Sequence, residues 1–501
     1  MKSKPENSPL EQASSSESGF RFTFNRAIGP IETCENITSD AGALIVREVI
    51  HRLGIDRMLD RLNDPRMASR VRYSLTELIL FRVAMLTLGY SAQDDADKLA
   101  HDAAFRIAAW DRSGDRCLAE RLASQPTQSR LINIVSADEN REAFANIAAS
   151  PLTERLALDI GDGDEERGTI DVDGYPEKTY GNQELSRYNG HHRQTEYYPF
   201  VAGLSLNGDF NCGATDGFIG AKLRPGNASG AADAVAFIDE CLDRATRRFP
   251  GLNIDFRFDA AFMIADVINH LDARNARFIG RMKGNAVLHE MAEHLVNRKP
   301  GPRPDYSREY VYEIGKYGAK SWNEKHRIIL VVIDDPPVVG ELDFGPHWFY
   351  LVTSHPEESM SANEALEHYR NRGTFEDRIG EFNAAIDLNL SHSEFRKNET
   401  LLQFAIFAFN LLSVIRAELE VEMVCLDLGR VQKRLLNAGA WIVKRSRRIV
   451  LKIAETAAGW WRLALERLNG FMIDSPRRLR RISWRSCPVH AHLSTPHPMM
   501  E

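Results

Sequence analysis

The stretch that decides the fold is YRNRGTFEDRI at residues 369–379. Read as a helix, it places Tyr369, Arg372 and Glu376 at intervals of three and four residues, so an aromatic ring, a cation and a carboxylate share one face. A surface helix with an Arg372–Glu376 salt bridge explains the same spacing, and an isolated motif of this kind favours that simpler interpretation. Other parts of the sequence are needed to distinguish a functional site from a salt-bridged surface helix.

Two earlier stretches each end an apolar, strand-like run on an aspartate. They read TIDVDG at residues 169–174 and IDFRFDA at residues 254–260, and they point to Asp173 and Asp259. Asp171 lies two residues before Asp173, on the same face of the strand, and is an alternative to it. With Glu376, the two strands and the helix supply three carboxylates, a set that can hold two divalent cations.

Composition places the chain among globular proteins. It has 501 residues, of which 43% are hydrophobic and 27% charged, enough for two to four domains or one core with large insertions. No run approaches the ~20 apolar residues of a membrane helix, and residues 1–20 lack the apolar centre of a signal peptide. The sequence therefore predicts a soluble, cytoplasmic protein that is not membrane-bound. Six scattered cysteines without a C-x-x-C pair indicate buried thiols, not disulfides or structural zinc.

Positive charge is concentrated near the C-terminus. The formal net charge of −7 argues weakly against a nucleic-acid partner, but residues 429–485 contain fifteen Lys and Arg against three acids. Such a surface attracts phosphate. Tryptophans at 441, 460 and 461 interleave with these cations; they could stack on bases, although for each ring alone the core is favoured. The DNA contacts predicted here are Lys444, Arg445, Arg447 and Arg448.

The N-terminal third reads as an extended or disordered arm at residues 1–35, followed by a helical domain at 36–160 that is a candidate for DNA binding. Residues 74–77, SLTE, form a capping box that opens a buried helix. Residues 122–131, LASQPTQSRL, resemble the start of a recognition helix, whose leading side chains contact bases. An ordinary helix start explains the same residues as well. The predicted base contacts are Thr127, Gln128 and Arg130.

The middle of the chain predicts an α/β fold with a ribonuclease H-like core, formed by residues 165–285 and 355–420. Three strands, at 169–173, 197–206 and 210–215, are followed by helix, strand, helix and strand. Asp259 and Glu376 are 117 residues apart, and β-rich runs in this gap predict an all-β insertion at 286–354. An apolar helix at 401–417 closes the core, and 421–501 reads as a basic helical region.

At these residues the sequence resembles the DDE transposases of bacterial insertion sequences, in the group with a Y-x-x-R-x-x-x-E-x-x-x-x-x-x-K signature. It is most similar to a subgroup that carries an S-D-A-G start, an A-S-Q-P-T-x-S-R-L segment and an L-R-P-G-N turn. These stand here at residues 39–42, 123–131 and 223–227. The similarity extends from about residue 36 to about residue 455.

The resemblance implies Asp173, Asp259 and Glu376 as catalytic residues that hold two Mg²⁺ ions, with Mn²⁺ as a substitute. It also implies cleavage at the ends of a DNA element followed by strand transfer, with a homodimer assembled on terminal inverted repeats and target DNA. The final Lys of the signature is Asn383 here, and Arg378 is a candidate replacement as a phosphate contact. Tyr369 and Arg372 would act near the DNA end. Two alternatives stay open: a nuclease of the same fold, and an inactive DNA-binding descendant.

Overall fold

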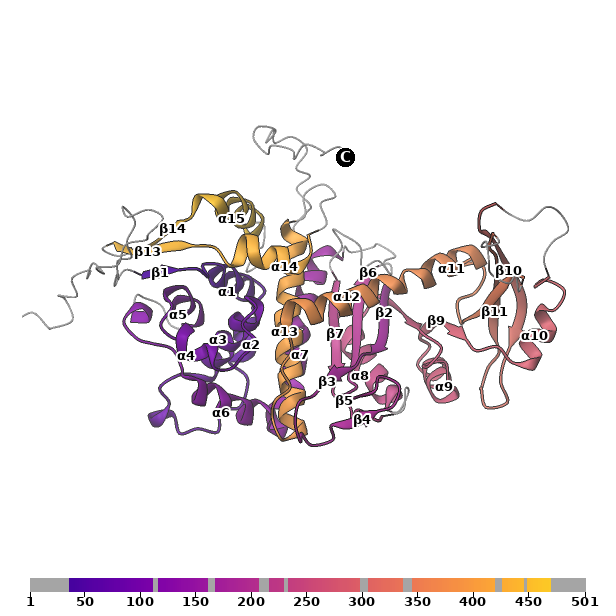
Figure 1. Cartoon of the computed structure of the whole chain (residues 1–501), viewed down its shortest axis with the longest axis horizontal. Coiled ribbons are helices and arrows are strands. Elements are labelled where there is room, and N and C mark those ends of the chain that lie inside the picture. The colour runs from indigo at the N-terminus through magenta and orange to yellow at the C-terminus, as the bar shows by residue number, and fades with distance from the viewer. Residues whose placement is uncertain are drawn as a thin grey trace, which may run out of the picture.

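The computed structural model describes residues 36–110, 116–160, 167–206, 216–228, 233–297, 305–336, 345–419, 426–445 and 448–469. Its centre is an eight-stranded sheet with the strand order β10-β11-β12-β9-β8-β2-β6-β7 (Figure 1). The strands are β2 (Arg167–Gly174), β6 (Phe200–Leu206), β7 (Asp216–Lys222), β8 (Asn253–Phe258), β9 (Arg277–Met282), β10 (Arg308–Tyr317), β11 (His326–Asp334) and β12 (His347–Thr353).

The predicted order of the core is confirmed. Strands β2, β6 and β7 pair antiparallel, and β8 and β9 then join β2 in parallel. The parallel strands are connected through α8 (Ala234–Arg248) and α9 (Ala265–Ala273). The central strands are buried on both faces, which explains their nearly continuous apolar sequence. The third strand begins at Asp216, whereas the predicted strand at 210–215 lies outside the described residues.

A second, smaller sheet was not predicted. It has the order β3-β5-β4 and is built from β3 (Glu177–Lys178), β4 (Arg187–Asn189) and β5 (Gln194–Tyr197). The prediction of one strand over 197–206 is therefore wrong, because β5 ends at Tyr197 and β6 begins at Phe200. The proline at 199 lies between them and lacks the N–H that a continuous ladder would use.

The prediction of an all-β insertion at 286–354 is wrong in two respects. The helix α10 (Ala286–Ala292) lies within it, and its strands β10, β11 and β12 extend the main sheet. Residues Tyr350–Thr353 of β12 pair antiparallel with β9. This pairing covers an edge of β9 whose N–H and C=O groups would otherwise be open to another chain.

Residues 369–379, the stretch that the sequence analysis started from, belong to two helices. The helix α11 (Ala362–Arg370) begins at a capping box of Ser361 and Glu364, and α12 (Arg372–Ile386) follows after Asn371. The predicted single helix is thus interrupted by one residue, and Tyr369 lies on α11 while Glu376 lies on α12. Figure 1 shows the two helices in succession between β10 and the long helix α13 (Phe395–Leu419).

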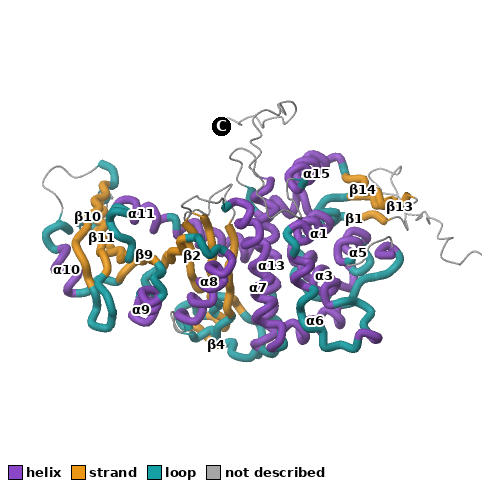
Figure 2. Tube along the Cα trace, turned by 180° about the vertical axis from the view of Figure 1, so that it is seen from behind, coloured by secondary structure: helices purple, strands orange, loops and turns teal. Residues whose placement is uncertain are grey.

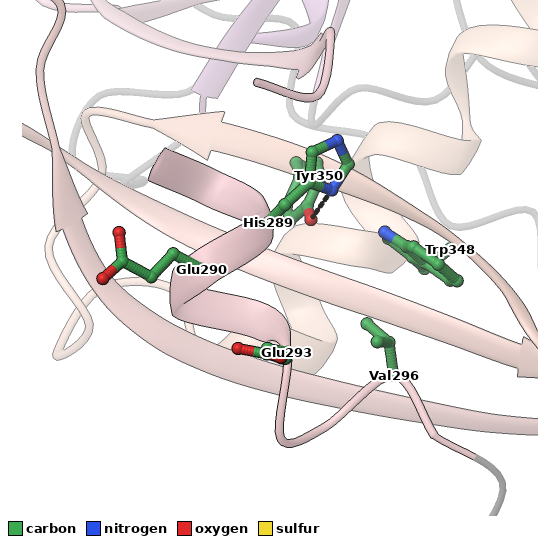
Figure 3. A pocket seen from close by; sticks show the side chains of 6 residues that line it. All are labelled: His289, Glu290, Glu293, Val296, Trp348 and Tyr350. Atoms are coloured by element: carbon green, nitrogen blue, oxygen red, sulfur yellow. Dashed lines mark hydrogen bonds between the residues drawn. The ribbon is translucent and has the colours of Figure 1, made fainter. Parts of the chain in front are cut away.

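The helix α13 connects the sheet to the N-terminal helices (Figure 2). It packs on α3 and α7, and one hydrophobic cluster joins Val46, Phe81, Phe407 and Trp461. In the described part of the chain, α13 alone is long and apolar enough to cross a membrane, but 94% of its most apolar window is buried inside the protein. The N-terminal helices are α1 (Ala43–Arg52), α2 (Ile55–Leu59), α3 (Leu75–Thr87), α4 (Asp95–Leu99), α5 (Ala103–Ala109), α6 (Gln125–Val135) and α7 (Asp138–Asp159).

Two sequence predictions hold within this helical region. The capping box of Ser74 and Glu77 is confirmed, and every residue of α3 is buried. Cys117 and Cys241 are free and buried, as expected of the cysteines. The N-terminal helices share their hydrophobic core with α13, so they do not form a core of their own. The boundary of a separate domain at 36–160 therefore stays a prediction. The predicted arm at 1–35 lies outside the described residues.

The C-terminal region is not purely helical, so that prediction is wrong. After α14 (Leu428–Val431) and one π-helical turn, η4 (Gln432–Leu436), the strands β13 (Ala440–Arg445) and β14 (Arg448–Ile453) form a hairpin before α15 (Glu455–Leu468). The strand β1 (Asn36–Thr38) pairs with β13. The hairpin carries many cations in a short stretch. Its β-branched residues favour strands, but they are interspersed with these cations, and the strand pattern was therefore missed in the sequence.

Candidate active site

The sheet brings two of the predicted carboxylates to the same edge. In the parallel pair of β2 and β8, Asp171 lies opposite Arg257. The same register, continued by two residues, puts Asp173 near the end of β2 beside Asp259, which follows the last residue of β8. The carboxyl ends of neighbouring parallel strands lie at the same end of a sheet. Asp173 and Asp259 are therefore close because each lies at the carboxyl end of its strand and the two strands are parallel neighbours.

The helix α12 adds a cation and a third carboxylate. The Arg372 Nη2 atom donates to Asp173 Oδ2 at 2.5 Å, and its Nη1 donates to Glu376. The guanidinium therefore bridges a residue of β2 and a residue one helical turn further along α12. Arg372 is only 9% exposed at its side chain, while Asp173 is 19% and Glu376 56% exposed, so the site opens towards Glu376.

The electrostatics of Asp173 reflect this crowding. Burial raises the pKa of Asp173 to about 6, and the charges of Asp259 and Glu376 add to the increase. Arg372 and the backbone N–H of Gly174 act in the opposite direction on this pKa. Asp259 and Glu376 are thus each close enough to Asp173 to repel its charge, and Arg372 balances part of that charge. This convergence agrees with the site expected from the sequence, although the catalytic role of the three residues stays a prediction.

The alternative aspartate, Asp171, has a different environment. It is fully buried, and Arg257 binds both of its oxygens, Nε to Oδ1 at 2.7 Å and Nη2 to Oδ2 at 2.6 Å. The remaining Arg257 nitrogen, Nη1, donates to the backbone oxygen of His368 at 2.6 Å. Asp171 therefore joins β2, β8 and α11, and the geometry favours Asp173 as the residue open to a substrate.

Tyr369 lies beside the same cluster. Its ring is half-buried, and burial raises the pKa of its hydroxyl, with Asp259 and Glu376 adding to the increase and Arg372 opposing it. The interruption at Asn371 therefore does not separate Tyr369 from the carboxylates.

Arg378 requires a correction. It is buried, and it pairs with Asp216 of β7 (Nε to Oδ2, 3.0 Å) and with Glu381 (2.5 Å). Arg416 of α13 joins the same two carboxylates. A guanidinium held in this network braces α12 against the sheet, and this geometry contradicts its predicted contact with phosphate.

The predicted DNA contacts outside the core differ in their exposure. Gln128 is buried and its Nε2 donates to the backbone oxygen of Leu78 at 3.3 Å, so the structure contradicts a base contact from this side chain. Arg130 is exposed on α6 and Thr127 half-exposed, and their contacts stay predictions. On the hairpin, Lys444, Arg445 and Arg448 are exposed, and Arg447 lies outside the described residues.

A second charged cluster beneath the site was not predicted. Asp255 on β8 is buried, and its Oδ2 lies 3.3 Å from Nε2 of His355 and 3.1 Å from Nε2 of His368. Arg167 Nε is 3.8 Å from the same oxygen. Burial alone would raise the pKa of Asp255, but the two imidazoles outweigh it and hold that pKa well below its usual value. The signal was present in the sequence, since Asp255 and Arg257 are charged residues within a buried strand.

This cluster predicts an acid-sensitive contribution to stability. Because the pKa of Asp255 is lower in the folded state, its stabilisation is present above the unfolded pKa of about 4 and is lost as pH falls through the folded pKa. We expect Asp255→Asn to lower the free energy of unfolding by about 1.5–3 kcal/mol near neutral pH, and less in acid. Urea unfolding across this pH range measures both effects. Asp239→Asn, which removes a more exposed partner of His270, is the control; equal losses in both variants would contradict the prediction.

The donors at the site suit a hard divalent cation in kind, because all three are carboxylates. Among the described residues, however, no three His, Cys, Asp or Glu side chains are arranged closely enough to enclose a metal ion. Between Asp173 and Glu376 the positive charge is supplied by Arg372. The chemistry of the donor set thus fits Mg²⁺, and Arg372 pairs with two of the three carboxylates.

The fold and the site define an α/β protein whose carboxylates converge where two parallel strands and a helix meet. The family model for the group 1 transposase DDE domain matches residues 20–468, and the chain belongs to this family. The piggyBac transposase synaptic complex with hairpin DNA is a similar solved structure, at 10% identity and a TM-score of 0.35, over 86% of this chain and 80% of that one. No curated protein matches the chain.

Proposed function

We propose that this protein binds the ends of a mobile DNA element, cleaves DNA strands there and joins a freed end to target DNA. The observation that carries the proposal is the bridge from Arg372 to Asp173 and Glu376, with Asp259 close enough to act on the charges of Arg372 and Asp173. Family membership supports the class of reaction. The geometry supports the assignment of these particular residues.

Asp173, Asp259 and Glu376 would hold Mg²⁺, and Mn²⁺ shares the preference for carboxylate oxygens. When bound, two such ions activate a water or a 3′-hydroxyl as nucleophile and stabilise charge on the attacking and leaving oxygens. The chain's own residues do the rest. The guanidinium of Arg372 would donate hydrogen bonds to a phosphate oxygen next to the scissile bond. Tyr369, on α11, would contact the DNA end.

Double-stranded DNA is the partner that the surface favours. The exposed cations of the β13–β14 hairpin would bind phosphates in any sequence, and Thr127 and Arg130 on α6 would add sequence preference. A single site with three carboxylates acts on one DNA end at a time. Two subunits on two ends are therefore the smallest assembly that cuts both without release between them.

The test is an incubation of the full chain with DNA that carries the terminal repeats, with Mg²⁺, with Mn²⁺ and with a chelator. We expect nicking at the repeat ends and joined products only with metal. Nicking without joined products would favour the nuclease alternative. Binding without any nicking would favour an inactive descendant and overturn the proposal.

The hairpin supports a separate prediction about salt. We expect Lys444→Gln, Arg445→Gln and Arg448→Gln together to weaken binding to all DNA sequences and to reduce the log-log salt slope by ~0.9 per lost phosphate contact. Fluorescence anisotropy over a range of salt concentrations measures the slope. The matched control replaces three exposed cations at the opposite end of the molecule in Figure 1, Lys316, Lys320 and Lys325. An unchanged slope in the hairpin variant would mean that this surface does not face DNA.

A further inference from the structure

Tyr198, between β5 and β6, packs directly against the backbone beside Asp173. A Cβ atom added to Gly174 would lie 2.7 Å from Cε1 and 3.1 Å from Cζ of the Tyr198 ring, so no other group fits between them. The ring is half-buried. Its hydroxyl end therefore lies at the border of the carboxylate site, on an element that the sequence motifs did not include.

A short chain of contacts holds this ring in place. The imidazole of His192 stacks on it, with ring centroids 5.7 Å apart and an interplanar angle of 27°. His192 Nδ1 is in turn 2.7 Å from Oε1 of Glu196, whose side chain is fully buried, and Gln194 donates to the other Glu196 oxygen at 2.7 Å. The backbone N–H of Tyr198 donates to the Arg224 oxygen at 3.1 Å. Both the backbone and the ring of Tyr198 are thus fixed.

A tyrosine hydroxyl is protonated near neutral pH, because its ordinary pKa is about 10. A neutral phenol next to anions is a hydrogen-bond donor. Within the described residues no hydrogen bond to this hydroxyl is found, so a phenylalanine would pack equally well against Gly174. The hydroxyl has no structural purpose that the fold reveals.

We propose that Tyr198 contacts the DNA end, its hydroxyl donating a hydrogen bond to a non-bridging phosphate oxygen next to the scissile bond, and that His192 positions the ring. This inference rests on the proposed function. A phosphate oxygen is the acceptor that a DNA substrate must bring close to Asp173 and Asp259. The phosphate would then be held from the segment between β5 and β6 as well as from Arg372 on α12.

Tyr198→Phe tests the hydroxyl alone. We expect nicking of terminal-repeat DNA to slow by ~10-fold or more, because a hydrogen bond to a phosphate oxygen that gains charge in the transition state is lost, while the unfolding temperature stays at the wild-type value. Tyr188→Phe on β4, whose ring is 63% exposed, is the matched control and should nick like the wild type. His192→Phe keeps a ring against Tyr198 but loses the pairing with Glu196, and we expect a smaller loss.

A second measurement separates a phosphate contact from a purely structural role. One non-bridging oxygen at the scissile phosphate is replaced by sulfur, a weaker acceptor, in each stereoisomer. We expect the wild type to be slowed by one isomer and Tyr198→Phe to be slowed less by the same isomer. Wild-type nicking with an unaffected Tyr198→Phe variant, or with an equal sulfur effect in both proteins, would overturn this inference alone. A wild type that does not nick would overturn the proposed function together with it.

Discussion

Asp173→Asn should abolish metal-dependent nicking while the protein stays folded and still binds DNA ends. The change removes one carboxylate of the proposed metal site but keeps the size of the side chain. Since removal of one member of a unit that acts together costs most of its catalysis, the rate should fall by at least ~1,000-fold. Single-turnover nicking assays in Mg²⁺ and gel-shift assays measure the two effects. Asp259→Asn and Glu376→Gln should behave in the same way.

The stability of the Asp173→Asn variant is not expected to fall with its activity. The pKa of Asp173, about 6, is above its unfolded value, so the folded state disfavours the charged carboxylate. Above about pH 6 the charge costs folding free energy, which Asp173→Asn removes. The unfolding temperature of this variant near neutral pH should be no lower than that of the wild type. An Asp173→Asn protein that still nicks would show that another residue, Asp171 first, is the ligand.

Arg257→Met should cause the largest loss of stability. Arg257 is fully buried, and its removal leaves the Asp171 carboxylate without its partner in the interior. Breaking a buried ion pair of this kind costs about 3–5 kcal/mol. Urea unfolding measures the loss. Because β2, β8 and α11 all meet at this side chain, nicking should also decrease in the fraction that folds.

The control for Arg257→Met is Arg248→Met. Arg248 pairs with Glu154 at 2.9 Å on the surface, where its side chain is 39% exposed, and such pairs contribute about 0–1 kcal/mol. The double variant Asp171→Leu with Arg257→Met should recover part of the stability, since it removes both charges. A loss below about 1 kcal/mol for Arg257→Met would mean that the pair is not formed in solution.

The sequence alone predicted that Asp173, Arg372 and Glu376 lie close together, because the signals for this are local; their catalytic role stays a prediction. Asp173 and Asp259 end apolar strands, and Arg372 and Glu376 have the spacing of one helical turn. Parallel pairing of β2 with β8 then brings the two aspartates together, and the Arg372–Asp173 ion pair joins α12 to them. The buried character of α3 and its capping box at Ser74 were predictable for the same reason: each depends on residues within one turn or one face.

The contacts that sequence missed depend on distant partners. Gln128 is a polar residue near the start of a helix, but it is buried and donates to the backbone oxygen of Leu78 on α3. Arg378 looks like a free cation until Asp216 and Arg416 are placed around it. Tyr198 carries no motif at all, and its place beside Asp173 follows only from the antiparallel pairing of β2 with β6, which sets Asp173 opposite Val201.

The position of α13 has a consequence for how DNA is measured. Its buried side chains belong to the same cluster as those of α1, α3 and α12, so the N-terminal helices cannot swing relative to the carboxylates without opening this core. If the N-terminal helices bind the terminal repeat, the protein acts as a ruler of fixed length. The cut would then fall at a set number of base pairs from the recognised sequence. That number would depend on the distance between the N-terminal helices and the carboxylates, which the shared hydrophobic core keeps constant.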